Sequence, residues 1–214
     1  MKLWHCHNAR SLRPLWALEE MGLDYQLEVL PFPPRFFKKE FLDDNVLGTV
    51  PYFTDADASM TESTAICQYL AERYKKDQFN IDIEHPEYGD YLNWLHHADA
   101  TLTFPQALFL RYSKLEPEAR RQPQVAEDYR NWFLARLRRL DAHIDGKQYL
   151  CDGRFTVADI AVAYALYLGK LLGLSADYSP QVSGYLDRLM QRPAFIKSVS
   201  LTSNAGGGID FASQ

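Results

Sequence analysis

Cysteine is scarce in this sequence, and the few cysteines that occur are far apart. The chain contains three, Cys6, Cys67 and Cys151, and no Cys-x-x-Cys pair. An odd number of widely spaced cysteines argues against a disulfide framework and against a zinc ribbon. We therefore expect free thiols and a reducing compartment.

A long hydrophobic run and an excess of basic residues are also lacking. The most apolar stretch, residues 160–169, is too short to span a bilayer, and the first ten residues lack the apolar core of a signal peptide. Lysines and arginines number 23 against 28 aspartates and glutamates, whereas nucleic-acid binding requires a basic surface. We expect a cytoplasmic protein without a membrane or nucleic-acid partner.

The sequence has enough apolar residues for a packed core. Of its 214 residues, 47% are hydrophobic and 24% are charged, which excludes disorder as the main state. This length is consistent with one large domain or two small ones.

The first third of the chain alternates between strand and helix signals. Residues 2–6 are β-prone, residues 11–23 place apolar side chains at helical spacing, and residues 25–29 alternate between apolar and polar. Strand, helix and strand within about thirty residues predict a βαβ unit. Further on we expect a short helix, a strand, a turn and a helix over residues 38–45, 50–53, 55–57 and 62–74, respectively.

Beyond this point the sequence changes character. Residues 75–86 are charged and aperiodic, which is typical of a domain boundary. We expect helices within residues 88–95, 125–144, 160–171 and 180–192. The predicted fold class is α/β followed by all-α, with one domain over residues 1–77, an all-helical domain over residues 86–200 and a tail over residues 201–214.

Residues 155–160 carry the clearest local signal. Thr156 can cap a helix whose third residue, Asp159, reaches back to the Thr156 amide. Phe155 and Ile160 have the spacing of a hydrophobic staple. We interpret this motif as stabilising the fold rather than as part of an active site, because both features stabilise the start of a helix.

The segment 61–64, Thr-Glu-Ser-Thr, allows two interpretations. Its side chains can cap the following helix. Alternatively, the free amides and positive dipole of the helix start, with the Ser63 hydroxyl, can bind a carboxylate while Glu62 binds an ammonium group. In the second case the segment would hold an amino-acid zwitterion.

Four segments resemble those of the cytosolic glutathione S-transferases in order and spacing, and the resemblance extends over nearly the whole chain. They are residues 17–23, 45–51, 60–70 and 155–160. The resemblance implies a thioredoxin-like N-terminal domain, an all-helical C-terminal domain and usually a homodimer. It also implies glutathione as a substrate, with no metal or other cofactor.

The resemblance also assigns roles to residues of the first domain. It implies that Pro51 follows a cis peptide bond and that Val50 pairs with the cysteinyl main chain of glutathione. It further implies that Glu62 and Ser63 hold the γ-glutamyl end. These roles agree with a zwitterion site at residues 61–64 and favour it over a cap.

The thiol-activating position departs from the better-known classes. Counted back from Gly22, Asn8 occupies the position at which the similar theta, phi and zeta classes have a serine. The omega class has a cysteine at this position. Arg10 stands at the position of the beta-class cysteine, and no tyrosine precedes Tyr25, so the tyrosine-using classes are excluded as templates. Asn8 through its amide, or Ser11 through its hydroxyl, can donate to a thiolate near the helix start. Both can equally cap that helix.

Other candidate contacts are less specific. Lys39, with its neighbour Lys38, can reach the glycyl carboxylate of glutathione, although a solvated pair of charges is the simpler interpretation. Phe104, Phe109 and Tyr112 can line a pocket for an apolar co-substrate or simply belong to the core. Two pairs of histidines lack convincing partner ligands, and we expect no metal site.

These features together predict a glutathione transferase whose glutathione thiolate attacks a small electrophilic, apolar co-substrate. A glutathione-dependent disulfide or peroxide reductase, with no protein cysteine as the nucleophile, is one alternative. A non-catalytic transferase-like interaction module is another, and the presence of Glu62 and Ser63 argues against it.

Overall fold

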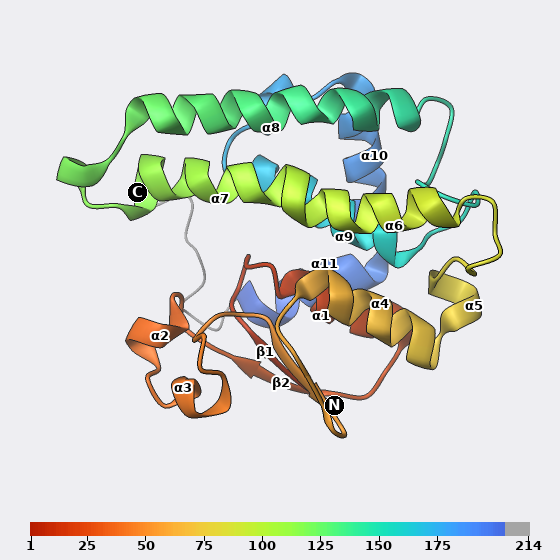
Figure 1. Cartoon of the computed structure of the whole chain (residues 1–214), viewed down its shortest axis with the longest axis horizontal. Helices are drawn as coiled ribbons and strands as arrows, with labels where there is room; N and C mark the ends of the chain where they lie inside the picture. The colour runs from red at the N-terminus through yellow and green to blue at the C-terminus, as the bar shows by residue number, and fades with distance from the viewer. Residues whose placement is uncertain (204–214) are drawn as a thin grey trace. The chain divides into compact units, whose positions relative to one another are not determined.

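The computed structural model describes residues 1–203, which fall into two compact units (Figure 1). The first unit comprises residues 1–80 and the described residues from Met190 onward, and the second comprises residues 81–189. No helix among the described residues is long and apolar enough to cross a membrane.

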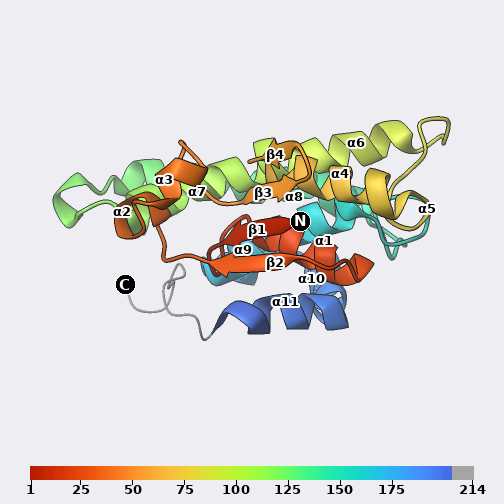
Figure 2. The ribbon, with the colours of Figure 1, turned by 90° about the horizontal axis from the view of Figure 1, so that it is seen from below.

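A four-stranded sheet organises the first unit (Figure 2). Its strands are β1 (Lys2–His5), β2 (Gln26–Val29), β3 (Tyr52–Asp55) and β4 (Ala58–Met60), in the order β2-β1-β3-β4. β1 and β2 are parallel, as the predicted βαβ unit requires, whereas β3 pairs antiparallel with both β1 and β4. The strand expected from residue 50 begins two residues later, and the predicted turn at residues 55–57 joins β3 to β4.

Three longer helices pack in the same unit, α1 (Leu12–Met21), α4 (Ser63–Tyr74) and α11 (Pro193–Ser203). α1 contacts both α4 and α11, and most of its side chains are buried. α1 ends at Gly22, as the sequence predicts. There φ is +60°, a left-handed conformation that glycine adopts without the steric penalty of a Cβ.

Short helices make the first unit more irregular than the sequence indicates. Instead of one helix over residues 38–45, the structure has α2 (Pro34–Phe37) and α3 (Phe41–Asp44). Another short helix, α5 (Lys76–Phe79), lies in the segment 75–86 that was expected to be aperiodic. Each is about one turn long, and hydrophobic periodicity cannot reveal a helix of that length.

The second unit is built of helices, as predicted. A continuous helical run extends from α6 (Tyr88–His96) through α7 (Phe104–Leu110), with π-helical segments over His97–Thr103 and Arg111–Leu115. The remaining helices are α8 (Pro123–His143), α9 (Val157–Leu171) and α10 (Pro180–Met190), with 3-10 turns at Glu118–Arg120 and Ser175–Asp177. No helix was predicted over residues 97–115, where α7 and both π-helical segments lie. Spacing at 3.6 residues would not distinguish a π-helix from an α-helix in any case.

α9 forms the core of this unit, and nearly all of its side chains are buried. The predicted capping box is confirmed, since the Thr156 amide donates to the Asp159 carboxylate at 2.9 Å. Asp159 also accepts hydrogen bonds from the Leu150 amide at 3.0 Å and from the Tyr185 hydroxyl at 2.8 Å. One buried carboxylate therefore holds the preceding loop and α10 against the start of α9.

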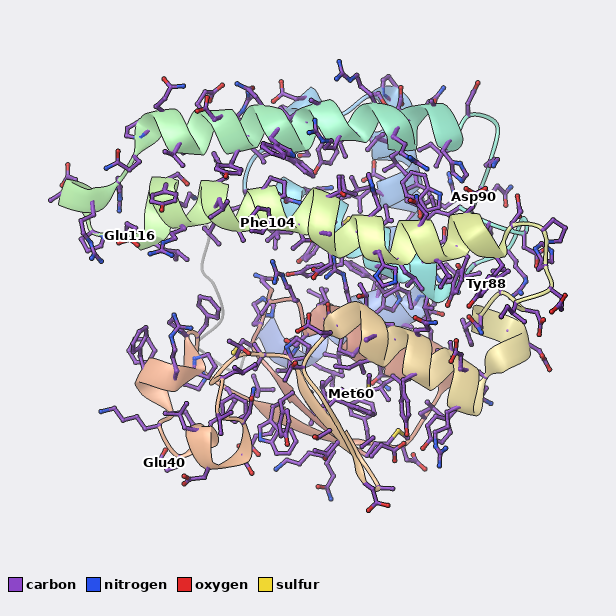
Figure 3. All side chains as sticks on the ribbon, in the orientation of Figure 1. Glu40, Met60, Tyr88, Asp90, Phe104 and Glu116 are labelled. Carbon is purple, nitrogen blue, oxygen red and sulfur yellow. The ribbon has the colours of Figure 1, made fainter. Side chains whose placement is uncertain are left out.

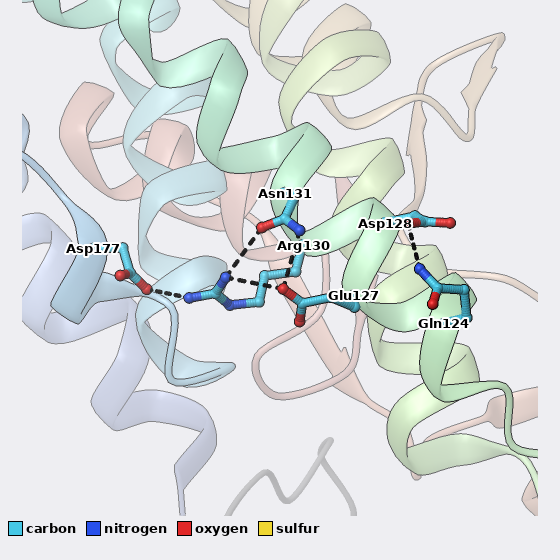
Figure 4. A network of polar contacts seen from close by, with 6 residues as sticks. All are labelled: Gln124, Glu127, Asp128, Arg130, Asn131 and Asp177. Atoms are coloured by element: carbon cyan, nitrogen blue, oxygen red, sulfur yellow. Dashed lines mark hydrogen bonds and ion pairs between the residues drawn. The ribbon is translucent and has the colours of Figure 1, made fainter.

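At the surface of the second unit, α8 is joined to the turn that precedes α10. The Arg130 guanidinium donates to Asp177 at 2.6 Å and is also bonded by Glu127 and Asn131 (Figure 4). Exposed ion pairs of this kind contribute at most about 1 kcal/mol each. The buried hydrogen bonds of Asp159 therefore matter more for the stability of this unit.

α11 belongs to the first unit, although the predicted helical domain extended to residue 200. The ring of Phe195 packs edge-on against Trp16 of α1 at 4.9 Å. Arg192 pairs with Glu20 through two contacts of 2.6 and 2.8 Å, and Lys197 pairs with Glu19 at 2.6 Å. Residues 201–203 of the predicted tail continue α11, and residues 204–214 lie outside the described part of the chain.

Candidate functional site

The register of the sheet brings three segments of the first unit to one edge, namely the end of the sheet at which individual strands begin or end. β1 ends and β3 begins at this edge, because Trp4 pairs antiparallel with Tyr52. β4 ends there too, because Phe53 pairs with Met60 (labelled in Figure 3). The residues after β1, before β3 and after β4 are therefore neighbours, and these segments contain Asn8, Val50, Pro51, Glu62 and Ser63.

The turn after β1 contains both candidates for thiol activation. Asn8 lies in the left-handed region, with φ at +61°, a conformation that asparagine tolerates better than most residues. Its side chain is half-buried, whereas Ser11 is fully buried. The Ser11 hydroxyl accepts a hydrogen bond from the Cys6 amide at 3.2 Å and donates to the Cys6 carbonyl at 3.5 Å. Ser11 thus closes the turn, chiefly by accepting the Cys6 amide.

The first amides of α1 also have partners within this turn. The Leu12 amide donates to the Ala9 carbonyl at 2.9 Å, and the Arg13 amide donates to the Arg10 carbonyl at 3.1 Å. The helix dipole still favours a negative charge nearby. A thiolate would nevertheless depend for direct hydrogen bonds on groups other than these two amides.

The Val50–Pro51 peptide bond is cis, as the resemblance implied. Val50 is half-buried and packs against the apolar cluster that contains Cys6 and Ala9. These contacts hold the segment before β3 next to the turn that carries Asn8. Val50 and the turn that contains Asn8 are therefore neighbours in the structure.

The start of α4 lacks a side-chain cap. Glu62 is extended and exposed, and no side chain forms a capping hydrogen bond at this end of the helix. Ser63 is buried, and its Oγ accepts a hydrogen bond from Arg13 Nη1 at 2.9 Å. The interpretation of residues 61–64 as a simple cap is therefore wrong, which leaves the amides of the first turn available to an anion.

Burial favours the neutral forms of the two histidines and the cysteine at the end of β1 and in the turn that follows. It lowers the pKa of His5 to about 4, and it also lowers the pKa of His7. Burial raises the pKa of the Cys6 thiol to about 12. A thiol with so high a pKa is a poor nucleophile at neutral pH, so Cys6 is a poor candidate for a reactive group.

A model of the glutathione S-transferase N-terminal domain matches residues 1–72, and a model of the C-terminal domain of the same family matches residues 98–193. The chain belongs to the glutathione S-transferase family. This confirms the family and the fold class predicted from the sequence, a thioredoxin-like domain followed by a helical domain.

Relatives of this transferase match it along most of its length. Glutathione S-transferase GstB of Escherichia coli is 28% identical, over 93% of this chain and 97% of that protein. Among solved structures, a glutathione S-transferase from Actinobacillus pleuropneumoniae has a TM-score of 0.79 and 26% identity, covering 100% of this chain and 96% of that one. A glutathione transferase from Phanerochaete chrysosporium in complex with oxidized glutathione has a TM-score of 0.81 and 27% identity, covering 94% and 95%.

The structure also shows the exposure and the neighbours of three further residues that the sequence suggested for this transferase. Lys39 is exposed between α2 and α3 of the first unit. Phe104, labelled in Figure 3, is 51% exposed in the second unit, and its ring packs edge-on against Tyr129 at 6.4 Å. Tyr112 is half-buried, and the Arg111 guanidinium lies 5.6 Å from its ring centroid. No cluster of histidine, cysteine, aspartate and glutamate within residues 1–203 could hold a metal ion.

Arg13 was not predicted from the sequence, although it contacts the candidate site. Its side chain is fully buried on α1 and reaches Ser63 at the start of α4. The signal was present, because Arg13 is a charged residue between Leu12 and Leu15 in the apolar part of the predicted helix. A buried arginine needs polar partners, but the sequence could not show that a partner lies fifty residues away.

Proposed function

We propose that this glutathione transferase binds glutathione along the edge of the sheet where β1 ends and β3 begins, and joins its sulfur to a small electrophile. The observation that carries the proposal is the uncapped start of α4, where Ser63 is buried and bonded to Arg13 while Glu62 is exposed. An acceptor for an ammonium group thus stands beside donors for a carboxylate. This pair of groups suits the zwitterionic γ-glutamyl end of glutathione.

The rest of the tripeptide would follow the same edge. The cysteinyl main chain would pair with the main chain of Val50 before Pro51, as an extended peptide pairs with a strand. The glycyl carboxylate would then approach Lys39, which is exposed beyond this segment. These contacts would place the glutathione thiol near the turn after β1.

Asn8 is our candidate for thiol activation, in preference to Ser11. The side-chain amide of asparagine has two N–H donors, and Asn8 is half-buried in the turn. Ser11 is fully buried, and its hydroxyl oxygen already accepts a hydrogen bond from the Cys6 amide. A free thiol has a pKa near 8.5, and lowering it by about two units requires roughly 2.7 kcal/mol of preferential stabilisation of the thiolate. One charge-assisted hydrogen bond and a helix start can supply an energy of that order.

The reaction would be a nucleophilic substitution or addition at carbon. The thiolate sulfur would form a bond to the electrophilic carbon, and a leaving group would depart with the electron pair of its bond, or the pair would be taken up by the co-substrate. Phe104 and Tyr112 are candidate contacts for the co-substrate in the second unit. Their partly exposed aromatic surfaces favour an apolar molecule.

The alternatives make different predictions about the thiol chemistry. Burial raises the pKa of Cys6, Cys67 and Cys151 to about 12, so a reductase would have to use glutathione itself as the nucleophile. Activity on an aryl halide together with weak activity on a mixed disulfide would support the transferase reaction. The reverse order would favour the reductase, and retention on glutathione-agarose without either activity would favour a binding module.

Two further properties are proposed from the family. We propose that the chain forms a homodimer, as the resemblance implies, and that it acts in the cytoplasm, where free thiols are stable. Analytical ultracentrifugation measures the first property, and a sedimenting species of one chain mass would contradict it. Fluorescence microscopy of a tagged chain measures the second.

A further inference from the structure

Arg13 is the one fully buried arginine within residues 1–203. It lies in the first turn of α1, and its Nη1 atom is 2.9 Å from Ser63 Oγ at the first position of α4. The guanidinium group stays charged at every pH at which the protein is folded. A permanent positive charge therefore lies next to the hydroxyl of the first residue of α4.

This contact determines which hydrogen bonds the Ser63 hydroxyl accepts and which it can donate. An arginine has N–H donors and no acceptor, so in the Arg13–Ser63 hydrogen bond the serine oxygen must be the acceptor. The hydroxyl proton of Ser63 cannot point at Arg13 and is left to be donated to another group. The hydroxyl is thereby set as a donor at the uncapped end of α4.

The position of the charge adds to this effect. A carboxylate oxygen bound to the Ser63 hydroxyl at about 2.7 Å would lie within about 6 Å of the guanidinium. Ser63 and Arg13 are both buried, and charges in such surroundings are screened less than charges in water. The free amides in the first turn of α4 attract the same carboxylate.

We infer that Arg13 is a positioning residue for the α-carboxylate of the γ-glutamyl group of glutathione. It acts through Ser63, whose hydroxyl it orients as a donor. It also acts through the attraction between its positive charge, close to the start of α4, and the carboxylate. It does not itself touch the ligand. The inference rests on the proposed function, because it concerns the same glutathione site.

Calorimetry with two ligands tests the inference. One ligand is glutathione, and the other is a glutathione analogue in which the γ-glutamyl α-carboxylate is replaced by hydrogen. The variants are Arg13→Gln, Arg13→Lys, Ser63→Ala and the double variant Arg13→Gln/Ser63→Ala. Arg192→Gln is the matched control, because Arg192 also anchors a helix to α1 in the first unit but pairs with Glu20. Thermal unfolding of each variant establishes that it is folded before binding is measured.

Arg13→Gln should weaken the binding of glutathione by about ten- to a hundred-fold, since it removes an interaction that supports a charged ligand group. Binding of the analogue should change by less than about two-fold. Arg13→Lys should retain part of the affinity, because it keeps the charge and loses the fixed geometry. In the Ser63→Ala background, Arg13→Gln should have a smaller effect than it has alone. Arg192→Gln should leave both affinities unchanged.

The outcomes separate this inference from the proposed function. If the unmodified protein binds no glutathione, the proposed function is wrong. If it binds glutathione but Arg13→Gln weakens both ligands equally, Arg13 has only a structural role and the inference is overturned while the function stands. If Arg13→Gln does not fold, Arg13→Lys takes its place. An Arg13→Lys variant whose preference for glutathione over the analogue is unchanged would then overturn the inference in the same way.

Discussion

Replacement of Asp159 by alanine should destabilise the second unit without affecting the glutathione site. The carboxylate is fully buried and accepts hydrogen bonds from the Thr156 amide, the Leu150 amide and the Tyr185 hydroxyl. Asp159→Ala leaves these three donors without their acceptor. Each unsatisfied buried donor costs about 1–3 kcal/mol, so the hydrogen bonds alone correspond to a loss of roughly 3–9 kcal/mol.

The buried charge of Asp159 opposes this loss. Burial raises the pKa of Asp159 to about 6, and the hydrogen bonds from Thr156 and Leu150 only partly offset that effect. A rise of about two units corresponds to roughly 3 kcal/mol of destabilisation at pH 7, and Asp159→Ala removes it. The donors can also shift towards water. We therefore expect a net decrease of about 2–4 kcal/mol in the free energy of unfolding at pH 7.

The sign of the pH dependence follows from the same pKa. A carboxyl whose pKa is higher in the folded state than in the unfolded state binds its proton more tightly when folded. Its contribution to stability is present below the unfolded pKa and is lost as the pH rises through about 6. The unmodified protein therefore gains stability relative to Asp159→Ala as the pH falls. The effect of the substitution should be about 1 kcal/mol larger at pH 5 than at pH 7.

Urea unfolding curves at pH 7 and pH 5, at one protein concentration, measure both effects. Asp187→Ala is the matched control, because Asp187 is 60% exposed and pairs only loosely with Lys170 at 3.5 Å; it should change stability by less than about 0.5 kcal/mol. A smaller effect of Asp159→Ala at pH 5 than at pH 7 would refute the reasoning about burial. Normal stability combined with lost glutathione binding would show that Asp159 belongs to the glutathione site.

Two other substitutions test the site and the packing. Ser63→Ala should lower glutathione affinity about ten- to a hundred-fold by calorimetry, because a hydrogen bond to a carboxylate contributes about 1.5–3 kcal/mol; unchanged affinity, matching that of the exposed-residue control Ser59→Ala, would contradict the assignment of Ser63. Gly169→Ala should destabilise the second unit by about 1–3 kcal/mol in thermal or urea unfolding, because a Cβ there would lie 2.0 Å from the Tyr178 hydroxyl and 3.1 Å from the Phe133 ring. A Gly169→Ala protein as stable as the original would show that α9 can shift to admit a methyl group.

The parts of the fold that could be predicted from the sequence are those encoded within a few neighbouring residues. The capping box joins Thr156 to Asp159 across three positions, and the Gly22 helix end depends on one residue. The two longer helices of the N-terminal region and the parallel strands β1 and β2 follow from local periodicity. Such features depend on the backbone and on burial of one face, both of which are visible in a short window.

The features that could not be predicted depend on contacts between distant residues. The Arg13–Ser63 hydrogen bond joins residues fifty positions apart, and the pairing of Arg192 with Glu20 groups α11 with the first unit. Ser11 is a different case, since its partner Cys6 is only five residues away. The thiol-activating role stayed open between Ser11 and Asn8 in the sequence, because the hydrogen bonds of a serine hydroxyl depend on the turn geometry rather than on residue type.

In the proposed function, the side chain of Asn8 activates the thiol of glutathione bound beside it. Ultraviolet absorbance of the thiolate against pH, recorded for bound glutathione in the unmodified protein, Asn8→Ala and Ser11→Ala, tests this role of Asn8 directly. Asn8→Ala should raise the thiol pKa by about one unit, equivalent to about 1–2 kcal/mol, and Ser11→Ala should raise it by less. A shift in Ser11→Ala with none in Asn8→Ala would reverse the assignment, and unchanged curves in both would show that the helix dipole and backbone amides activate the thiol without either side chain.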